Sequence, residues 1–164
     1  MFLGVFVDGW NLASCECMLS DPDALDGLTE QIIACTITVH NTLGPGLLES
    51  IYQRCMVMEL GARALSIETE RSVPVIYRGE PIESPFKVDL VVEESVVVEL
   101  KAVIALAPVH HAQVITYLKL TGCPVGLLIN FNVTSLRNGL GGLCAQTHTR
   151  KLSFLQFLLF ECRV

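Results

Sequence analysis

Residues 86–103, FKVDLVVEESVVVELKAV, constrain the fold more than any other part of the chain. Two apolar runs, Lys87–Val92 and Val96–Val103, flank the short polar segment Glu93–Ser95. This pattern is typical of two β-strands joined by a tight turn. The sequence therefore predicts an antiparallel hairpin, and the rest of the chain must be arranged around it.

The predicted turn also fixes which side chains of the hairpin face each other. With Glu93–Ser95 as the turn, Asp89 lies opposite Glu99 and Lys87 lies opposite Lys101. Because side chains alternate along a strand, one face is wholly apolar and is expected to enter the core: Val88, Leu90, Val92, Val96, Val98 and Leu100. The other face carries the charges: Asp89, Val91, Val97, Glu99 and Lys101. A slip of one residue would push the acids into the apolar layer, so the hydrophobic pattern selects this register.

The opposed acids Asp89 and Glu99 call for a cation. Directly opposed Cβ atoms in an antiparallel pair are about 4.5–5.5 Å apart, and like charges at that distance are destabilising. Lys101, two residues beyond Glu99 on the same face, is one candidate cation. A divalent metal such as magnesium is the other, because it prefers oxygen ligands. The alternative is an exposed hairpin face with an ordinary Glu–Lys pair, since a short motif alone is weak grounds for a metal site.

Composition limits the kinds of protein this chain can be. At 164 residues with 51% apolar and 17% charged residues, it is expected to form one folded domain with a substantial core. The formal net charge is −6. An acidic chain is a poor non-specific binder of phosphate backbones. If the protein acts on nucleic acid, binding must therefore be local, assisted by a metal, or supplied by a partner.

The compartment is expected to be the cytoplasm. The seven cysteines are an odd number without a CxxC pair, which favours reduced thiols. The apolar start Met1–Val7 has no preceding basic residue and is followed by Asp8, so it is a poor signal peptide. The apolar segment Leu152–Phe160 is too short to span a bilayer. We therefore expect a soluble protein without a membrane partner.

Two helices are predicted before the first strand. Thr29 is the expected N-cap of a helix that runs to about Leu43 and is stopped by Gly44–Gly46. A second helix is predicted over about Leu47–Leu60, with Gly61 as its stop. Its expected apolar stripe is Leu48, Ile51, Tyr52, Cys55 and Met58. Glu49 falls in its first turn, where an acid also favours the helix dipole.

The remaining elements follow in order along the chain. Residues Ser66–Arg78 and Pro81–Val92 read as strands, with a turn between them. A helix is expected over about Val109–Leu120, with three polar side chains on one face: His110, Gln113 and Tyr117. The apolar run Val125–Phe131 reads as a buried strand. The predicted order α-α-β-β-β-α-β gives a mixed sheet with helices against it, in the α/β or α+β class.

Four segments together carry a family resemblance. They are GPGLLESIY at Gly44–Tyr52, DLVVEESVVVELKAV at Asp89–Val103, HHAQVITYLKLTG at His110–Gly122 and GLLINF at Gly126–Phe131. In this order they resemble the GxxExxY family of the PD-(D/E)xK superfamily, which includes RecB-type nuclease domains. The resemblance covers about Leu28 to Leu140. It implies a restriction-endonuclease-like mixed β-sheet flanked by helices over residues 28–146, with 1–27 as an N-terminal extension and 147–164 as an apolar C-terminal tail.

The resemblance also implies a function and a set of catalytic residues. Such nucleases hydrolyse phosphodiester bonds of DNA or RNA with magnesium or manganese. By motif position the metal ligands would be Asp89, Glu99, the Leu100 carbonyl and Glu49. Lys101 would position the attacking water or stabilise the transition state. Gln113 would orient Lys101 or a phosphate oxygen, and Tyr117 would hydrogen-bond the backbone.

One departure from the family pattern weakens the nucleic-acid interpretation. Family members tend to carry a basic residue shortly after the last strand, where this chain has Gly139–Gly142 and only Arg137 nearby. The alternative function is therefore a binding or interaction module that keeps the nuclease fold without turnover. The apolar tail would then be a contact for a second copy or for a partner protein.

Overall fold

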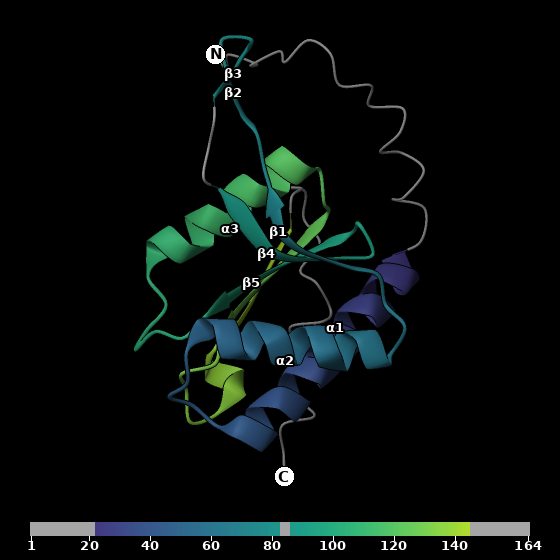
Figure 1. The fold of residues 1–164 in the computed structure, drawn as a ribbon, viewed down its shortest axis with the longest axis vertical. Coiled ribbons are helices and arrows are strands. Elements are labelled where there is room, and N and C mark those ends of the chain that lie inside the picture. Colours follow the sequence, from purple (N-terminus) through teal and green to yellow (C-terminus); the bar gives the residue numbers. More distant parts are fainter. Residues whose placement is uncertain (1–21, 83–85, 145–164) are drawn as a thin grey trace.

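The computed structural model describes residues 22–82 and 86–144 (Figure 1). A five-stranded sheet has the strand order β1-β4-β5-β6-β7, and β2 and β3 pair separately. The strands are β1 Ile67–Ser72, β2 Val75–Tyr77, β3 Glu80–Ile82, β4 Lys87–Val92, β5 Val96–Lys101, β6 Val125–Asn130 and β7 Leu140–Cys144. The helices are α1 Pro22–Leu43, α2 Glu49–Ala62 and α3 Pro108–Thr121, with a short 3-10 turn at Leu136–Asn138.

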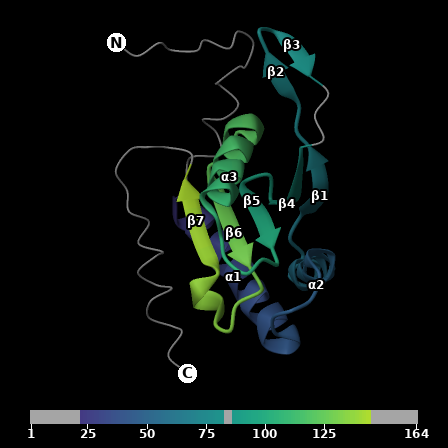
Figure 2. The same cartoon turned by 90° about the vertical axis from the view of Figure 1, so that its left-hand side faces the viewer.

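The sheet is mixed and covered on both faces. β5 and β6 are parallel, and the other neighbours in the large sheet are antiparallel. Helices α1 and α2 lie on one face and α3 on the other (Figures 1 and 2). This is the restriction-endonuclease-like arrangement of a mixed sheet flanked by helices that the sequence predicted. Within the described ranges no helix is long and apolar enough to cross a membrane.

The central hairpin has the predicted register. Its backbone pairs are Val92–Val96, Val91–Val97 and Leu90–Val98. The predicted opposition of Asp89 and Glu99 lies one step beyond the last of these pairs. The hairpin is not an exposed face: Glu99 is 1% exposed, because α3 covers the side of the sheet that carries Val91 and Val97.

One residue of the predicted apolar face lies on the opposite side. Leu90, Val92 and their partners on β5 pack in the core against α1 and α2, whereas Val88 packs with Val91 and Tyr117 against α3. The alternation is broken at Asp89, where the β1–β4 pairing skips the step between Thr69–Leu90 and Arg71–Val88. The prediction for Val88 was therefore wrong, because it assumed a regular strand.

The first helix is longer than predicted. It begins at Pro22, and Thr29 is an interior residue whose Oγ1 donates to the Leu25 carbonyl at 2.7 Å rather than a cap. The predicted boundary after Gly27 therefore falls inside α1. Residues 1–21 and the tail 147–164 lie outside the described residues, so the expected contact of the tail with a second copy or a partner stays a prediction.

The second helix buries only part of the predicted stripe: Tyr52 enters the core and Cys55 packs against it, partly buried. Its buried residues are Tyr52, Met56 and Leu60, while Leu48 and Met58 are 74% and 72% exposed. The helix also continues past Gly61 to Ala62. Tyr52 selects this face, because its ring stacks on Phe131 with centroids 4.4 Å apart and draws the residues at helical spacing inward.

Two predicted strands are each divided in two. The chain leaves β1 at Ser72 and forms the small β2–β3 hairpin, which projects beyond the large sheet (Figures 1 and 2). Pro74 separates β1 from β2, since proline cannot donate to the ladder.

The strand β7 was not predicted, because its glycine-rich sequence LGGLC has little apolar alternation.

A glycine on β6 lets α3 approach the sheet closely. A Cβ atom at Gly126 would lie 2.5 Å from Val114 Cγ1 on α3. The helix therefore packs against bare backbone at this point, and its polar side chains reach the end of β4 described below.

Candidate active site

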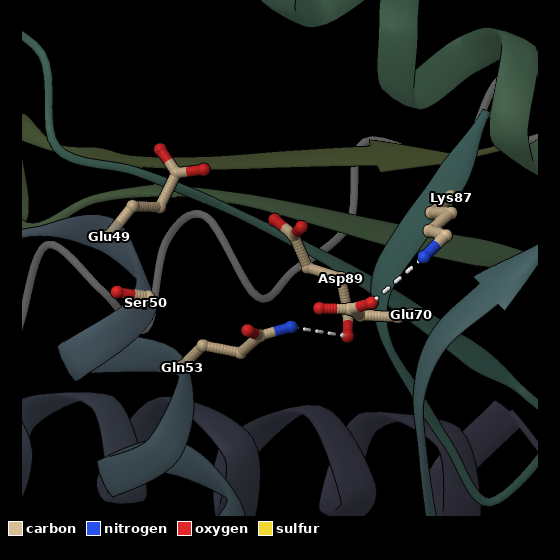
Figure 3. Close-up of a pocket in the computed structure, with 6 residues that line it drawn as sticks. All are labelled: Glu49, Ser50, Gln53, Glu70, Lys87 and Asp89. Atoms are coloured by element: carbon tan, nitrogen blue, oxygen red, sulfur yellow. Dashed lines mark hydrogen bonds and ion pairs between the residues drawn. The ribbon is translucent and has the colours of Figure 1, made fainter. Parts of the chain in front are cut away.

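A pocket of about 370 Å³ lies between α2 and the strands β1 and β4 (Figure 3). Its lining residues are Glu49, Ser50 and Gln53 from α2, Glu70 from β1, and Lys87 and Asp89 from β4. Two predicted site residues, Glu49 and Asp89, thus meet in one pocket. The other residues of the lining were not predicted as site residues.

Glu49 is positioned by the turn that precedes α2. Tyr52 Oη donates to the Gly44 carbonyl at 2.7 Å and accepts from the Leu47 backbone N–H at 3.1 Å. Gly44 and Gly46 have positive φ angles of 65° and 98°, which glycine adopts without strain. The buried Tyr52 therefore holds the turn in place, and α2 starts at Glu49 with its side chain at the pocket.

Asp89 is held by one neighbouring strand and one helix. Its Oδ2 accepts a hydrogen bond from the Leu100 backbone N–H at 2.8 Å, and its carbonyl accepts one from Gln53 Nε2 at 3.1 Å (Figure 3). Burial raises the pKa of Asp89, and this effect outweighs the Leu100 hydrogen bond and the positive charge of Lys101, both of which lower it. In an extended strand the N–H and C=O of a residue point to the same side, so the Leu100 carbonyl also points to the β4 side of β5.

Glu99 and Lys101 form a buried ion pair on β5. Lys101 Nζ donates to Glu99 Oε1. Burial, followed by the negative charge of Asp89, raises the pKa of Glu99 to about 7, although Lys101 opposes the rise. Burial lowers the pKa of Lys101, but the hydrogen bond and charge of Glu99 outweigh it, so this pKa lies above its usual value. The cation that the opposed acids were predicted to need is therefore supplied in part by Lys101.

The end of β5 is fixed by the neighbouring strand β6. The Phe131 N–H donates to the Lys101 carbonyl at 2.8 Å. The side chain of Asn130, 1% exposed, donates to the Val103 carbonyl at 2.8 Å and accepts from the Val103 N–H at 3.1 Å. Asn130 thus clamps the chain just after Lys101. Sequence reasoning placed it in a buried strand without recognising this role.

The acids and the lysine form one electrostatic group. Burial raises the pKa of Glu49, the Lys101 charge opposes the rise, and the Asp89 charge adds to it. Glu99 is likewise affected by Asp89, Lys101 and Glu49. The charge of Asp89 therefore raises the pKa values of Glu49 and Glu99, and Glu49 raises that of Glu99, whereas the interaction with Glu99 lowers the pKa of Asp89. Lys101 opposes the two rises without cancelling them.

The donor set fits a divalent cation bound by two carboxylates. Glu99 Oε2 is buried and has no hydrogen-bond partner among the described residues. A buried carboxylate oxygen without a partner is costly, and a cation would satisfy it. Magnesium commonly takes only one or two protein carboxylates and keeps several waters, so Asp89 and Glu99 suffice. In the described part of the chain no three His, Cys, Asp or Glu side chains are grouped closely enough to hold an ion, so Glu49 does not complete a closed set in this arrangement.

The polar side chains of α3 lie on one face as predicted, but they form hydrogen bonds with each other and with nearby backbone groups. Gln113 Nε2 donates to Tyr117 Oη at 2.8 Å, and Tyr117 Oη donates to the Lys87 carbonyl at 2.9 Å. The Gln113 amide is therefore bonded to Tyr117 rather than to Lys101. His110 Nδ1 accepts from the Ala107 N–H at 3.1 Å, which caps the start of α3. These contacts fix the helix to the end of β4, beside Asp89.

Gln53 and Glu70 are among the pocket residues that were not predicted from the sequence, and of these two only the first could have been found from a sequence pattern. Gln53 follows Glu49 by four residues on the same helix, so helical spacing already placed both on one side of α2. Glu70 gave no such signal. In the sequence it looks like an ordinary polar residue on an edge strand. Its positive φ angle could not be anticipated, because the residue is not a glycine or an asparagine.

Comparison with known proteins adds one match. A family model described as the PD-(D/E)XK nuclease superfamily matches residues 26–141. The matched range contains all of the acids and the lysine described above. No curated protein and no solved structure matches the chain.

Proposed function

Since the chain belongs to the PD-(D/E)XK nuclease superfamily, we propose that it hydrolyses phosphodiester bonds of DNA or RNA with magnesium or manganese. We further assign it to the GxxExxY group of that superfamily on Gly46, Glu49 and Tyr52. One observation carries the metal assignment: Glu99 has a buried carboxylate oxygen that finds no hydrogen-bond partner within residues 22–82 and 86–144, beside Asp89 and Lys101. Members of the superfamily generally use divalent metals, and their substrates are nucleic acids.

Each residue of the site has a proposed role. Asp89, Glu99 and the Leu100 carbonyl would hold the ion, and Glu49 across the pocket would contact it through water. The ion, when bound, lowers the pKa of a coordinated water and offsets negative charge on the phosphate. Lys101, already oriented by Glu99, would donate a hydrogen bond to the attacking water or to the phosphate as charge develops.

The two residues of α3 have supporting roles in this proposal. Tyr117 holds the backbone of Lys87, and Gln113 holds Tyr117. Both therefore keep β4 at the position that presents Asp89 to the pocket. The first prediction, that Gln113 orients Lys101 or a phosphate oxygen, stays open for the substrate-bound protein.

A cleavage assay tests the proposal. The full chain is incubated with labelled single- and double-stranded DNA and RNA, with magnesium, with manganese and with chelator. We expect cleavage that needs the metal and falls by about 10²–10³-fold in Asp89→Asn, which removes a charged ligand of the ion, and in Lys101→Met, which removes the donor to the attacking water or phosphate. The matched control is Glu30→Gln, an exposed acid on α1, which should keep full activity. Cleavage that persists in Asp89→Asn would reveal a contaminant, and the assignment would fail.

A binding module without turnover is the second candidate. It is favoured by the net charge of −6 and by the absence of a base in Gly139–Gly142. Calorimetric titration with magnesium and manganese separates the two candidates from a purely structural role. Stoichiometric binding that disappears in Glu99→Gln, together with no cleavage of any substrate, would establish the module.

A further inference from the structure

Glu70 has an unusual backbone conformation for a strand residue. Its φ angle is +50°, in the left-handed region. An L-residue is disfavoured there because its Cβ crowds the backbone carbonyl. The other non-glycine residues with positive φ in the described part of the chain are all in turns: Ala64, Arg78, Glu93 and Glu94. Glu70 is within β1, so no reversal of the chain explains its strain, and strain of this kind is characteristic of functional sites.

The strained residue lies next to the proposed metal ligand. The β1–β4 pairing contains Thr69–Leu90 and Arg71–Val88 but omits the step between them, at Glu70 and Asp89. The Glu70 side chain lines the pocket, and its Oε2 is 3.0 Å from Lys87 Nζ (Figure 3). At this distortion of β1, the Glu70 carboxylate therefore lies in the pocket and is paired with Lys87.

Among the described residues that line this pocket, Lys87 is the one with a basic side chain. Its backbone is fixed, because its carbonyl accepts the hydrogen bond from Tyr117. Its side chain is 54% exposed, so the ammonium group is accessible from solvent. It comes two residues before Asp89 on β4. An ammonium group at this position is suited to bind an anionic phosphate that enters beside the carboxylates.

We propose that Lys87 is the phosphate-binding residue of this pocket, and that Glu70 occupies it until a nucleic-acid phosphate takes its place. The Glu70 carboxylate offers Lys87 the same kind of charged oxygen acceptor as a phosphate does. Nucleic acid must therefore displace Glu70 to bind. The proposal rests on the proposed function in one respect, that the anion is a nucleic-acid phosphate.

Binding without cleavage tests the proposal. Fluorescence anisotropy with labelled single- and double-stranded DNA is measured in chelator at several salt concentrations. Because exposed ion pairs of this kind are weak, Glu70→Gln should tighten binding by about fivefold at most. Lys87→Ala should weaken binding and reduce the salt slope by about 0.7 for single strands and 0.9 for duplex. In the Lys87→Ala background, Glu70→Gln should change the affinity by less than about twofold.

The control separates a local effect from a change of net charge. Glu68 is on the same strand, pairs with Arg71 at 3.4 Å and does not line the pocket. Glu68→Gln removes the same charge and should change the affinity by less than about twofold, since it frees no base in the pocket. Glu70→Gly is a second variant that suits the positive φ angle. It should raise the melting temperature and give the same gain in affinity as Glu70→Gln.

Several outcomes would overturn the proposal, and they are distinct from failure of the nuclease assignment. An equal gain from Glu68→Gln, an equal gain without Lys87, or no binding by any variant would each refute the role of the pair. Metal-dependent cleavage with no effect of Glu70 would leave the nuclease intact and reject this inference. Tighter binding in Glu70→Gln without cleavage by the wild type would support the phosphate site and reject the nuclease.

Discussion

The raised pKa of Glu99 predicts an unusual pH dependence of stability. Burial and the charge of Asp89 raise this pKa from 4.5 to about 7. The folded protein therefore holds the proton more tightly than the unfolded chain does. As pH rises through this interval the unfolded state ionises first, so the free energy of unfolding must fall.

The size of the fall follows from the same values. A tenfold change in proton affinity is worth about 1.4 kcal/mol, so the rise from 4.5 to about 7 corresponds to about 3 kcal/mol. The loss begins near pH 4.5, is complete a little above pH 7, and is absent below pH 4.5. Asp89, whose pKa is also raised by burial, contributes in the same direction.

Urea unfolding in chelator between pH 4.5 and 8 measures this effect, with Glu99→Gln as the perturbed protein. The variant should lose about 3 kcal/mol less than the wild type over this range, because glutamine does not ionise. Lys101 loses its charged partner in the variant, so the two proteins are compared by the slope of stability against pH and not by their absolute free energies of unfolding. Glu30→Gln on α1 is the matched control and should follow the wild type.

The same experiment can refute the reasoning. If Glu99→Gln and the wild type show parallel pH profiles, Glu99 has the same pKa in the folded and unfolded states. The orphaned carboxylate would then not be a strained feature of the fold, and its weight in the metal assignment would be lost.

Three further predictions concern the metal, α3 and β7. Magnesium should raise the melting temperature more at pH 8 than at pH 5, because at low pH the ion must displace a proton from Glu99; equal shifts would contradict this. Tyr117→Phe should lower the free energy of unfolding in urea by about 1 kcal/mol, since the part-buried hydrogen bond to the Lys87 carbonyl is lost. Gly139→Ala, whose Cβ would lie 2.2 Å from a backbone carbonyl, should melt well below Gly142→Ala, whose Cβ would meet nothing within 4 Å.

The central hairpin was predictable because two independent signals agree. Alternation of apolar and charged residues and the short polar turn at Glu93–Ser95 both select one register, and the structure has it. The three-and-four spacing of Gln113 and Tyr117 likewise placed them on one face of α3, where they are bonded to each other. Periodic local patterns are the information that a sequence carries most directly.

The errors arose where long-range contacts overrule local pattern. Ile51 and Met58 looked like core residues of α2, but the stacking of Tyr52 on Phe131 sets the buried face. Ser66–Arg78 read as one strand, yet only its first half finds a partner in the large sheet. No local pattern in the sequence encodes these choices, because they depend on which distant element is available to pack against.

The candidate site was predictable in its acids and its lysine but not in its surroundings. Asp89, Glu99 and Lys101 stand out as charges in an apolar hairpin. Glu70 and Lys87 do not stand out, because an acid on an edge strand and a lysine at a strand start are common. Their relation depends on one backbone angle at Glu70, which only the three-dimensional structure reveals.

Gly126 on β6 has no side chain, so α3 packs directly against the backbone of the sheet at this point. A Cβ atom there would lie 2.5 Å from Val114 Cγ1, closer than the 3.4–4 Å of ordinary contact, so it would lift α3 away from the sheet. Such a lift would pull the Tyr117 hydroxyl from the strand end that carries Lys87. A residue with no side chain on β6 thereby sets how closely α3 approaches the sheet, and with it the hydrogen bond from Tyr117 that holds the start of β4.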